Sequence, residues 1–239
     1  MNLQDITHPP TLAPVSSLKE KLHWLLRKHF MAQFHGEYRR AILSMLEIKE
    51  DARLLDLGCG DGRFSKEMAK IVGTSALYGF DRLDWDSIGF QQIVGDLNEP
   101  LPLESESFDA VVASQVIEHL SDTDIFIKEA YRVLRPLGYF IVSTDNLASL
   151  HNIMYLLWSK QPEPCGVSDE MGLSYKRPGH RRIFTIQALY KLLRYHGFKV
   201  ERIIGSSYYP LPLPLARFMC KVDKWHSRTI TVKARKEKI

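Results

Sequence analysis

From residue 53 onward, short apolar runs alternate with stretches in which apolar residues recur every three or four positions. The short runs are typical of buried strands, and the longer spacing is typical of helices with one buried face. The predicted strands cover residues 53–57, 76–80, 92–94, 108–113, 139–143, 198–204 and 229–235. The predicted helices cover residues 63–72, 123–134 and 185–195. This alternation indicates an α/β fold in which parallel strands are joined by right-handed crossovers.

Several segments depart from this alternation. Residues 1–15 contain three prolines and predict an irregular arm. Residues 16–48 carry an apolar stripe at helical spacing and predict an N-terminal helical cap on a main domain that covers residues 49–239. Within that domain, residues 147–182 are irregular and predict a lid or a substrate-facing insertion. The connection between residues 81 and 92 is too short for a full helix and predicts a loop or a single turn.

Composition narrows the class of protein. Apolar residues make up 45% of the chain and charged residues 25%, which is typical of a folded globular domain. The net charge of +4 is too small to indicate nucleic-acid binding by itself. Three cysteines without CxxC spacing argue against a disulfide scaffold or a zinc site and favour a reducing compartment. Neither a signal peptide nor a membrane-spanning apolar run is visible, so the sequence predicts a cytoplasmic protein.

The stretch LLDLGCGDGRFS, residues 54–65, places three glycines behind the first predicted strand. A glycine-rich turn there lies at the carboxyl edge of the sheet, where α/β domains bind their ligands. The dinucleotide fingerprint GxGxxG fails in both registers, because Arg63 or Ser65 stands where the third glycine should be. A P-loop fails as well, since no Gly-Lys-Ser/Thr follows. A nicotinamide-dependent dehydrogenase is therefore disfavoured.

An acidic residue ends or follows each of the first three predicted strands: Asp56, Asp81 and Asp96. A carboxylate at the position of Asp56 suits an ammonium group better than a pyrophosphate. Asp81 can accept hydrogen bonds from both hydroxyls of a ribose, and Asp96 can accept one from the exocyclic amine of adenine. An ammonium, a ribose and an adenine in line indicate S-adenosylmethionine.

Four motifs occur in order between residues 50 and 145: LLDLGCGDGRF, YGFD, IVGDLNEPLPLESESFDAVVASQVIEHL and EAYRVLRPLGYFIVST. With these motifs the sequence resembles the class I S-adenosylmethionine-dependent methyltransferases. A weaker similarity continues in HRRIFTIQALYKLLRYHGFKV. The resemblance implies a Rossmann-like, doubly wound and mostly parallel seven-stranded sheet with an antiparallel last strand.

The resemblance also implies where the cofactor is bound. Residues after the first strand would line its methionine part, those after the second its ribose and adenine edge, those after the third its adenine ring, and those after the fourth its sulfonium and methyl group. In that order they are Asp56, Gly58, Cys59, Gly60 and Gly62; Asp81 and Arg82; Asp96 and Leu97; Ser114 and Gln115. The short connection after Asp81 departs from the family pattern and leaves open which residue packs on the adenine face.

The sequence says less about the residues that bind the methyl acceptor. Methyl transfer from a sulfonium is mainly a matter of positioning, but a hydroxyl acceptor also needs a base near its proton. His119 is a candidate base, although a histidine in the sequence IEHL can also be packed locally. The predicted substrate-binding residues are Asp145, Asn146, His180 and Arg181; polar residues at the start of a helix are the alternative for the last two. The histidines are scattered without ligand spacing, which predicts metal-independent transfer.

Two apolar stretches bear on the acceptor: LHNIMYLLW (150–158) and YYPLPLPLARFM (208–219). Either stretch can be part of the core or of a lid. The alternative is that they bind an amphipathic or lipid-linked acceptor at a membrane surface. The leading interpretation is methylation of an oxygen, nitrogen or carbon atom of a small molecule or a cell-surface glycan. Two further readings stay open: an RNA or protein methyltransferase, for which no nucleic-acid module is visible, and a non-catalytic S-adenosylmethionine-binding protein. Nothing indicates the oligomeric state.

Overall fold

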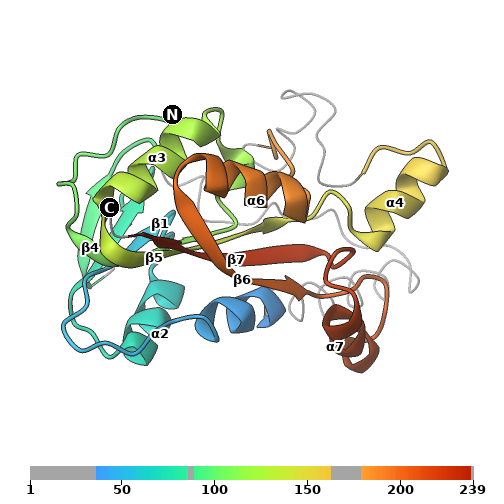
Figure 1. The fold of residues 1–239 in the computed structure, drawn as a ribbon, viewed down its shortest axis with the longest axis horizontal. Coiled ribbons are helices and arrows are strands. Elements are labelled where there is room, and N and C mark those ends of the chain that lie inside the picture. Colours follow the sequence, from blue (N-terminus) through green and yellow to red (C-terminus); the bar gives the residue numbers. More distant parts are fainter. Residues whose placement is uncertain (1–35, 86–88, 163–178, 238–239) are drawn as a thin grey trace, which may run out of the picture. The chain divides into compact units, whose positions relative to one another are not determined.

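The computed structural model describes residues 36–85, 89–162 and 179–237 (Figure 1). Residues 37–237 contain one seven-stranded sheet with the strand order β3-β2-β1-β4-β5-β7-β6. The strands are β1 (Leu54–Leu57), β2 (Leu77–Asp81), β3 (Gln91–Val94), β4 (Phe108–Ser114), β5 (Leu134–Asp145), β6 (Phe198–Ser206) and β7 (Thr229–Lys236). The helices are α2 (Arg63–Val72), α3 (Thr123–Val133), α4 (Leu150–Leu157), α6 (Ile186–Tyr195) and α7 (Leu213–Val222), with a 3-10 turn η2 (Ile117–His119).

Strand directions confirm the predicted fold class. Strands β1 to β5 pair in parallel. Strand β7 is antiparallel to both of its neighbours, β5 and β6. The sheet is therefore mostly parallel with an antiparallel last strand, and the carboxyl ends of β1 to β6 share one edge.

Helices cover both faces of this sheet. Helices α3 and α6 lie on one face and α2 on the other (Figure 1). On the first face, Phe126 of α3 and Leu189 of α6 join one core cluster with Leu55 and Val111 of the central strands. Helix α2 buries residues at intervals of four, among them Met68, as the predicted amphipathic pattern requires.

Local signals account for several helix ends. Helix α2 has the predicted bounds, and Gly73 ends it in a left-handed conformation. Thr185 is the N-cap of α6, because its side chain accepts a hydrogen bond from the Ala188 amide at the start of this helix. Helix α3 begins in the same way, with Asp122 accepting from the amides of Asp124 and Ile125.

Strand β5 begins earlier than predicted. Its pairing with β4 starts at Leu134, directly after α3, and a register shift precedes the regular pairing from Tyr139 onward. Leu137 inside this stretch has φ 66°. Pro136 and Gly138 lie in this stretch, and the chain re-enters the sheet through an irregular strand directly after α3.

The two apolar stretches both form helices. Residues 150–157 form α4, and the stretch 208–219 contains most of α7, which the sequence did not predict. Its prolines are tolerated because Pro212 is the N-cap and Pro214 lies in the first turn, where the helix uses no amide donor. No helix in the described ranges is both long and apolar enough to cross a bilayer.

Some predictions fall on residues that the structure does not describe. The irregular arm and most of the predicted helical cap lie in residues 1–35, outside the described ranges, and residues 37–43 are helical. The central part of the predicted lid, residues 163–178, also lies outside them. In the connection from β2 to β3, the described residues contain no helix, in keeping with the predicted loop.

Candidate functional site

The glycine-rich turn joins β1 to α2 at the carboxyl edge of the sheet. The Gly58 and Cys59 amides both donate to the carbonyl oxygen of Phe80 in β2, at 2.7 and 3.2 Å. Gly58 has φ +79°, and a Cβ added to it would lie 2.4 Å from Val116 Cγ2. Glycine is required at this position, because a side chain would be strained and would collide with the segment that follows β4. The turn thus touches its neighbours on both sides.

Asp81 ends β2 and reaches across to this turn. Its Oδ2 atom accepts a hydrogen bond from the Gly60 amide at 2.8 Å, and its Oδ1 atom accepts one from the Leu83 amide at 3.0 Å. A Cβ added to Gly60 would meet nothing within 4 Å. An ionised carboxylate can accept about four hydrogen bonds, so Asp81 retains capacity for the hydroxyls of a diol.

Asp56 lies below the turn rather than in it. The side chain is buried, and its Oδ2 accepts a hydrogen bond from the Ser65 hydroxyl of α2 at 2.5 Å. Burial, assisted by the negative charge of Asp81, raises the pKa of Asp56 to about 6. Its other oxygen, Oδ1, is buried without a hydrogen-bond partner among the described residues, so direct pairing with an ammonium group stays a prediction. Through Oδ2, Asp56 fixes the turn against α2.

The other residues predicted around the turn differ in exposure. Burial raises the pKa of the Cys59 thiol to about 12. A Cβ added to Gly79 would lie 2.6 Å from Cys59 Sγ, so this side chain packs on β2 and only its backbone belongs to the turn. Gly62, at φ 70°, is the N-cap of α2. Arg82 is exposed beyond Asp81.

The ends of β3 and β4 complete this edge. Asp96 Oδ1 accepts hydrogen bonds from the main-chain and side-chain nitrogens of Asn98, and Leu97 is buried beside it. Gln115, directly after Ser114, has φ 57°, and its amide donates to the Ser143 carbonyl oxygen at 3.0 Å. A non-glycine residue in this conformation costs about 1–3 kcal/mol, and such strain is concentrated at functional sites. The predicted sulfonium position therefore has strained backbone.

A second group of side chains lies at the ends of β4 and β5. Glu118 and His119 belong to the turn η2, and His180 is held beside them because the Arg181 and Arg182 amides donate to the Glu118 carbonyl oxygen at 2.7 and 3.2 Å. The rings of His119 and His180 are perpendicular neighbours, with centroids 4.8 Å apart. One ligand atom from each of Glu118, His119 and His180 lies within 4.8 Å of the others.

Burial shifts the pKa values of ionisable side chains in this second group. Glu118 is 1% exposed, and its burial, with the nearby charge of Asp145, raises its pKa to about 8. Burial, followed by the positive charge of Arg228, lowers the pKa of His180. Asp145 Oδ2 lies 3.7 Å from His180 Nδ1. The structure thus brings together three of the predicted residues, His119, Asp145 and His180.

The remaining predicted substrate residues have other contacts. The Asn146 side chain is fully buried and donates to the carbonyl oxygens of Trp225 and Ser227 at 2.7 and 2.8 Å, which holds the turn before β7. Arg181 has an exposed side chain, and its main chain anchors His180. Contact between these two residues and a substrate stays a prediction.

Comparison with known proteins identifies the family. The family described as "Methyltransferase domain" matches residues 28–203. The chain belongs to this family. The mitochondrial ubiquinone biosynthesis O-methyltransferase of Rattus norvegicus is 27% identical over 170 residues, which cover 66% of this chain and 47% of that protein. The chain spans about half the length of the curated relatives that it matches first.

Solved structures share the fold of this methyltransferase domain. An S-adenosylmethionine-dependent methyltransferase from Mesorhizobium loti has a TM-score of 0.59 at 19% identity, covering 82% of this chain and 96% of that one. Phosphoethanolamine N-methyltransferase 2 of Haemonchus contortus, solved with S-adenosyl-L-methionine, has a TM-score of 0.56 at 17% identity, covering 84% of this chain and 52% of that one. The predicted membership of the S-adenosylmethionine-dependent class I methyltransferases is confirmed.

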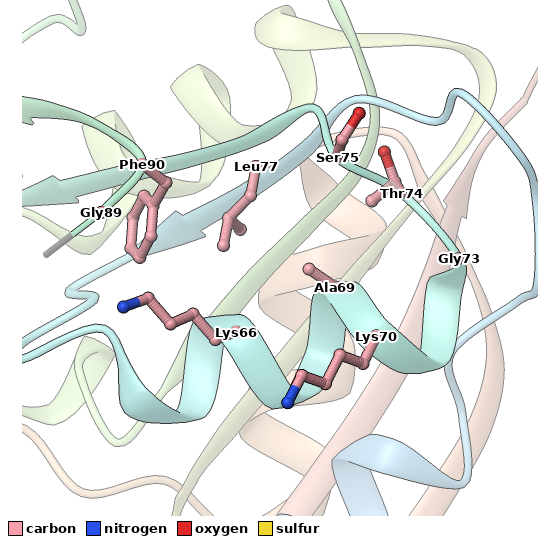
Figure 2. Close-up of a pocket in the computed structure, with 9 residues that line it drawn as sticks. All are labelled: Lys66, Ala69, Lys70, Gly73, Thr74, Ser75, Leu77, Gly89 and Phe90. Atoms are coloured by element: carbon pink, nitrogen blue, oxygen red, sulfur yellow. The ribbon is translucent and has the colours of Figure 1, made fainter.

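The cofactor edge of the methyltransferase domain fits the ligand that the family implies. Space is open above Gly60, and the carboxylate of Asp81 lies across the turn from it. A cavity of about 540 Å³ lies elsewhere, lined by Lys66 and Lys70 of α2 and by Leu77 and Phe90 at the amino ends of β2 and β3 (Figure 2). That cavity is at the opposite edge of the sheet from Asp81 and contains none of the predicted cofactor residues.

Glu118 is the functional candidate that sequence reasoning missed. The letters E and H stand side by side in IEHL, but the partner His180 is far away in the sequence. The interpretation that the histidines are scattered is wrong for this pair, because the fold brings His119 and His180 into contact. The sequence indicated their proximity only weakly: His119 follows a predicted strand, and His180 follows a Pro-Gly turn.

Proposed function

We propose that this chain transfers the methyl group of S-adenosylmethionine to a hydroxyl oxygen of a small-molecule acceptor. The observation that carries the proposal is the hydrogen bond between Asp81 and Gly60, which sets a carboxylate across an open glycine turn in a methyltransferase domain. Oxygen is favoured over nitrogen or carbon because the curated relatives that the chain matches first are named ubiquinone biosynthesis O-methyltransferases.

The cofactor edge holds and orients the donor. Asp81 accepts hydrogen bonds from the ribose hydroxyls, and Asp96 faces the adenine amine. The backbone of the turn at Gly58 and Gly60 approaches the methionine part, while Asp56 and Ser65 keep this turn fixed on α2. S-adenosylmethionine, when bound, supplies a methyl group on an excellent leaving group. A fixed orientation is therefore the main contribution of this edge to the rate.

The second group of side chains serves the acceptor. A hydroxyl oxygen becomes a good nucleophile only when its proton is removed. Glu118, His119 and His180 surround one point near the ends of β4 and β5, next to the strained Gln115. Asp145 Oδ2 lies 3.7 Å from His180 Nδ1, so its charge acts on that ring. A side chain of this cluster accepts the proton of the acceptor hydroxyl, and His119 is the candidate base.

A direct experiment separates this activity from a non-catalytic role and from methylation of macromolecules. The purified protein is titrated with S-adenosylmethionine, S-adenosylhomocysteine and NADH in a calorimeter. It is then incubated with methyl-labelled S-adenosylmethionine and, separately, phenols and catechols, amines, RNA or a protein mixture. Binding of the adenosyl ligands alone, with label transferred to phenols or catechols, supports the proposal. Binding without transfer to any acceptor supports a non-catalytic protein, and label found on RNA or on protein supports an RNA or protein methyltransferase.

An apolar or lipid-linked acceptor is a second candidate. Helices α4 and α7 follow the carboxyl ends of β5 and β6, and both present large apolar side chains to solvent. Leu157 is 78% exposed, Trp158 63%, Phe218 59% and Val222 67%. Large exposed apolar side chains on two helices that follow this edge favour contact with an apolar partner. If the acceptor carries an apolar chain, adding that chain to a methylated head group lowers KM, and Leu157→Ser with Phe218→Ser removes the gain.

The two candidates differ only in the acceptor. A cell-surface glycan on a lipid carrier belongs to the second one. The cytoplasmic location and the transient contact with a membrane surface stay predictions. A carrier-linked acceptor that is methylated no faster than its isolated head group contradicts the second candidate and leaves the first intact.

A further inference from the structure

We infer that the His151 side chain forms a hydrogen bond to an uncharged polar group of the acceptor, other than the oxygen that is methylated, and so determines which acceptors this methyltransferase prefers. The inference deepens the proposed function and rests on it. His151 lies in the first turn of α4, in the segment that follows β5. It belongs neither to the cofactor edge nor to the cluster of Glu118, His119 and His180.

The ring of His151 is buried without a hydrogen bond. The residue is 4% exposed, and neither Nδ1 nor Nε2 has a hydrogen-bond partner among the described residues. Leaving both nitrogens of an imidazole unsatisfied is costly, and native structures normally provide a partner for such atoms. The unpaired ring therefore indicates a partner that is not part of the described chain, either a ligand or a water molecule.

Neighbouring side chains at the start of α4 share this property. Ser149 Oγ and Asn152 Oδ1 are buried and have no hydrogen-bond partner among the described residues. The Asn152 side-chain nitrogen is used, because it donates to the Asn146 carbonyl oxygen at 3.0 Å and so fixes the start of α4 next to the end of β5. Unpaired polar atoms thus occur on three of four consecutive residues in a segment that is itself held in place, which favours a ligand-binding role for this turn.

Contacts place His151 near the second group of side chains at the ends of β4 and β5. Its ring is perpendicular to the Tyr209 ring, with centroids 5.5 Å apart. The Arg228 guanidinium lies 5.8 Å from the centroid of the same Tyr209 ring. The Arg228 carbonyl oxygen accepts the Asn146 amide at 2.8 Å, one residue after Asp145. His151 therefore lies at the carboxyl edge of the sheet, among residues that follow β5 and β6 and precede β7.

The charge state of the ring limits what it can bind. Burial, followed by the positive charge of Arg228, lowers the pKa of His151 to about 4. The imidazole is then neutral near pH 7, with one donor and one acceptor nitrogen. Such a ring pairs well with a hydroxyl or a carbonyl group, but it is a weak base at this pH. His151 therefore suits recognition of the acceptor rather than removal of its proton.

A neutral, buried imidazole discriminates between acceptors in one direction. An acceptor with a hydroxyl or carbonyl group at the matching position satisfies the imidazole, whereas one with a methyl group there leaves it unpaired. A site built to hydrogen-bond a polar group rejects the analogue that lacks this group more strongly than an apolar pocket rejects an added one. His151 should therefore raise the preference for the polar acceptor by about 10-fold or more.

Transfer of the labelled methyl group to matched phenols tests this preference. In each set of phenols, a hydroxyl, an acetyl or a methyl group occupies the same ring position. The ratio of kcat/KM for the polar phenol to kcat/KM for the methyl one is measured in the wild type and in two variants. His151→Phe should lower this ratio by about 10-fold or more for the best set, whereas His151→Gln, which keeps a donor and an acceptor, should retain part of it. Intrinsic reactivities cancel, because every protein is given the same phenols.

Stability distinguishes recognition from a structural role. His151→Phe replaces two unpaired buried nitrogens by carbon, so its midpoint of urea denaturation should equal or exceed that of the wild type. If a buried water instead joins His151 to the rest of the chain, His151→Phe should be less stable and the ratio unchanged, which overturns the inference. His226→Phe is the matched control, because the His226 ring pairs with Asp223 at 2.6 Å. This variant should keep the wild-type ratio.

Binding measurements keep this test separate from the proposed function. The protein is saturated with S-adenosylhomocysteine, which carries no methyl group to transfer, and is titrated with the same phenols by calorimetry. The preference for the polar phenol should be about 10-fold or more stronger in the wild type than in His151→Phe. Equal preferences in the two proteins, or no binding of any phenol, overturn the inference even where label transfer supports the proposed function. Absence of transfer to every phenol contradicts the proposed function, and the titration then still decides whether His151 binds the polar group.

Discussion

The two halves of the site differ in how many of their polar side-chain atoms are hydrogen-bonded within the chain. On the cofactor side, each carboxylate has a hydrogen-bond partner within the chain: Asp56 with Ser65, Asp81 with Gly60 and Leu83, and Asp96 with Asn98. Only Asp56 Oδ1 is buried there without a hydrogen-bond partner among the described residues. On the acceptor side, Glu118 Oε2 and His180 Nδ1 have no hydrogen-bond partner among those residues, although His180 Nδ1 lies 3.7 Å from Asp145 Oδ2.

This difference indicates that hydrogen bonds within the chain hold the cofactor side in shape before a ligand binds, whereas the acceptor side is less fully paired. The cofactor side uses its polar groups to hold backbone in shape, and the ligand meets a turn that is already fixed. The acceptor side keeps buried polar groups that water or a bound ligand can satisfy. Substitutions on the cofactor side should therefore act through the geometry of the turn, and those on the acceptor side through what is bound there.

The largest effect is expected at Asp81. Asp81→Ala removes the acceptor of the ribose hydroxyls and releases the Gly60 amide. Hydrogen bonds to a charged group contribute about 1.5–3 kcal/mol each, so we expect a loss of about 100-fold or more in S-adenosylmethionine affinity. Asp84→Ala is the control, since Asp84 is an exposed carboxylate in the same connection. Calorimetric titration measures both, and equal affinities of the two variants would contradict the assigned role.

The next effect is expected at the turn itself. Gly58→Ala combines a positive φ with a contact of 2.4 Å to Val116, whereas Gly60→Ala has the same kind of φ and nothing within 4 Å. We expect Gly58→Ala to lower the free energy of unfolding by about 3 kcal/mol and Gly60→Ala by about 1 kcal/mol. Urea denaturation measures both.

The double variant Gly58→Ala, Val116→Ala isolates the contact. Shortening Val116 makes room for the added methyl group and should restore about half of the lost stability. No restoration would mean that the backbone conformation alone accounts for the loss, and that the turn does not depend on the segment after β4.

The same contrast explains what the sequence could predict. The cofactor side is encoded in short motifs, because a strand, a turn and a helix follow one another directly, and α2 has its predicted bounds. The acceptor side depends on contacts between distant segments, such as the Arg181 and Arg182 amides with the Glu118 carbonyl oxygen. Neither the hydrophobic periodicity nor the spacing of the motifs predicts that contact. Helix α7 was missed for a local reason, since prolines that begin a helix resemble prolines that break one.

A smaller effect is expected where the acceptor side is supported by ordinary hydrogen bonds. Asn146→Ala removes the donor to the Trp225 and Ser227 carbonyl oxygens. We expect a loss of about 2 kcal/mol in stability, because two buried carbonyl groups lose a partner. S-adenosylmethionine affinity should be unchanged, since these contacts lie away from the glycine turn. An affinity loss larger than the stability loss would instead place Asn146 in the ligand site.

The smallest effect concerns how Asp56 responds to pH. Its carboxyl has a pKa of about 6 in the folded protein because it is buried, against 3.8 for an ordinary aspartate. A folded-state pKa above the unfolded one means that the folded protein binds more protons, so stability falls as pH rises between about 4 and 6 and is level above that. Between pH 5 and 8 this amounts to about 1.4 kcal/mol.

Asp56→Asn removes this dependence while retaining an oxygen that can accept the Ser65 hydroxyl. The variant should therefore gain about 1.4 kcal/mol relative to the wild type between pH 5 and pH 8, measured by urea denaturation at each pH. Glu118 also titrates in this range, but it is present in both proteins and cancels in the difference. Ser65→Ala is the companion variant, because it removes the hydrogen bond that favours the ionised form and should steepen the loss of stability with pH. A difference between Asp56→Asn and wild type that does not change with pH would mean that Asp56 is ionised at all these pH values, and that burial does not raise its pKa.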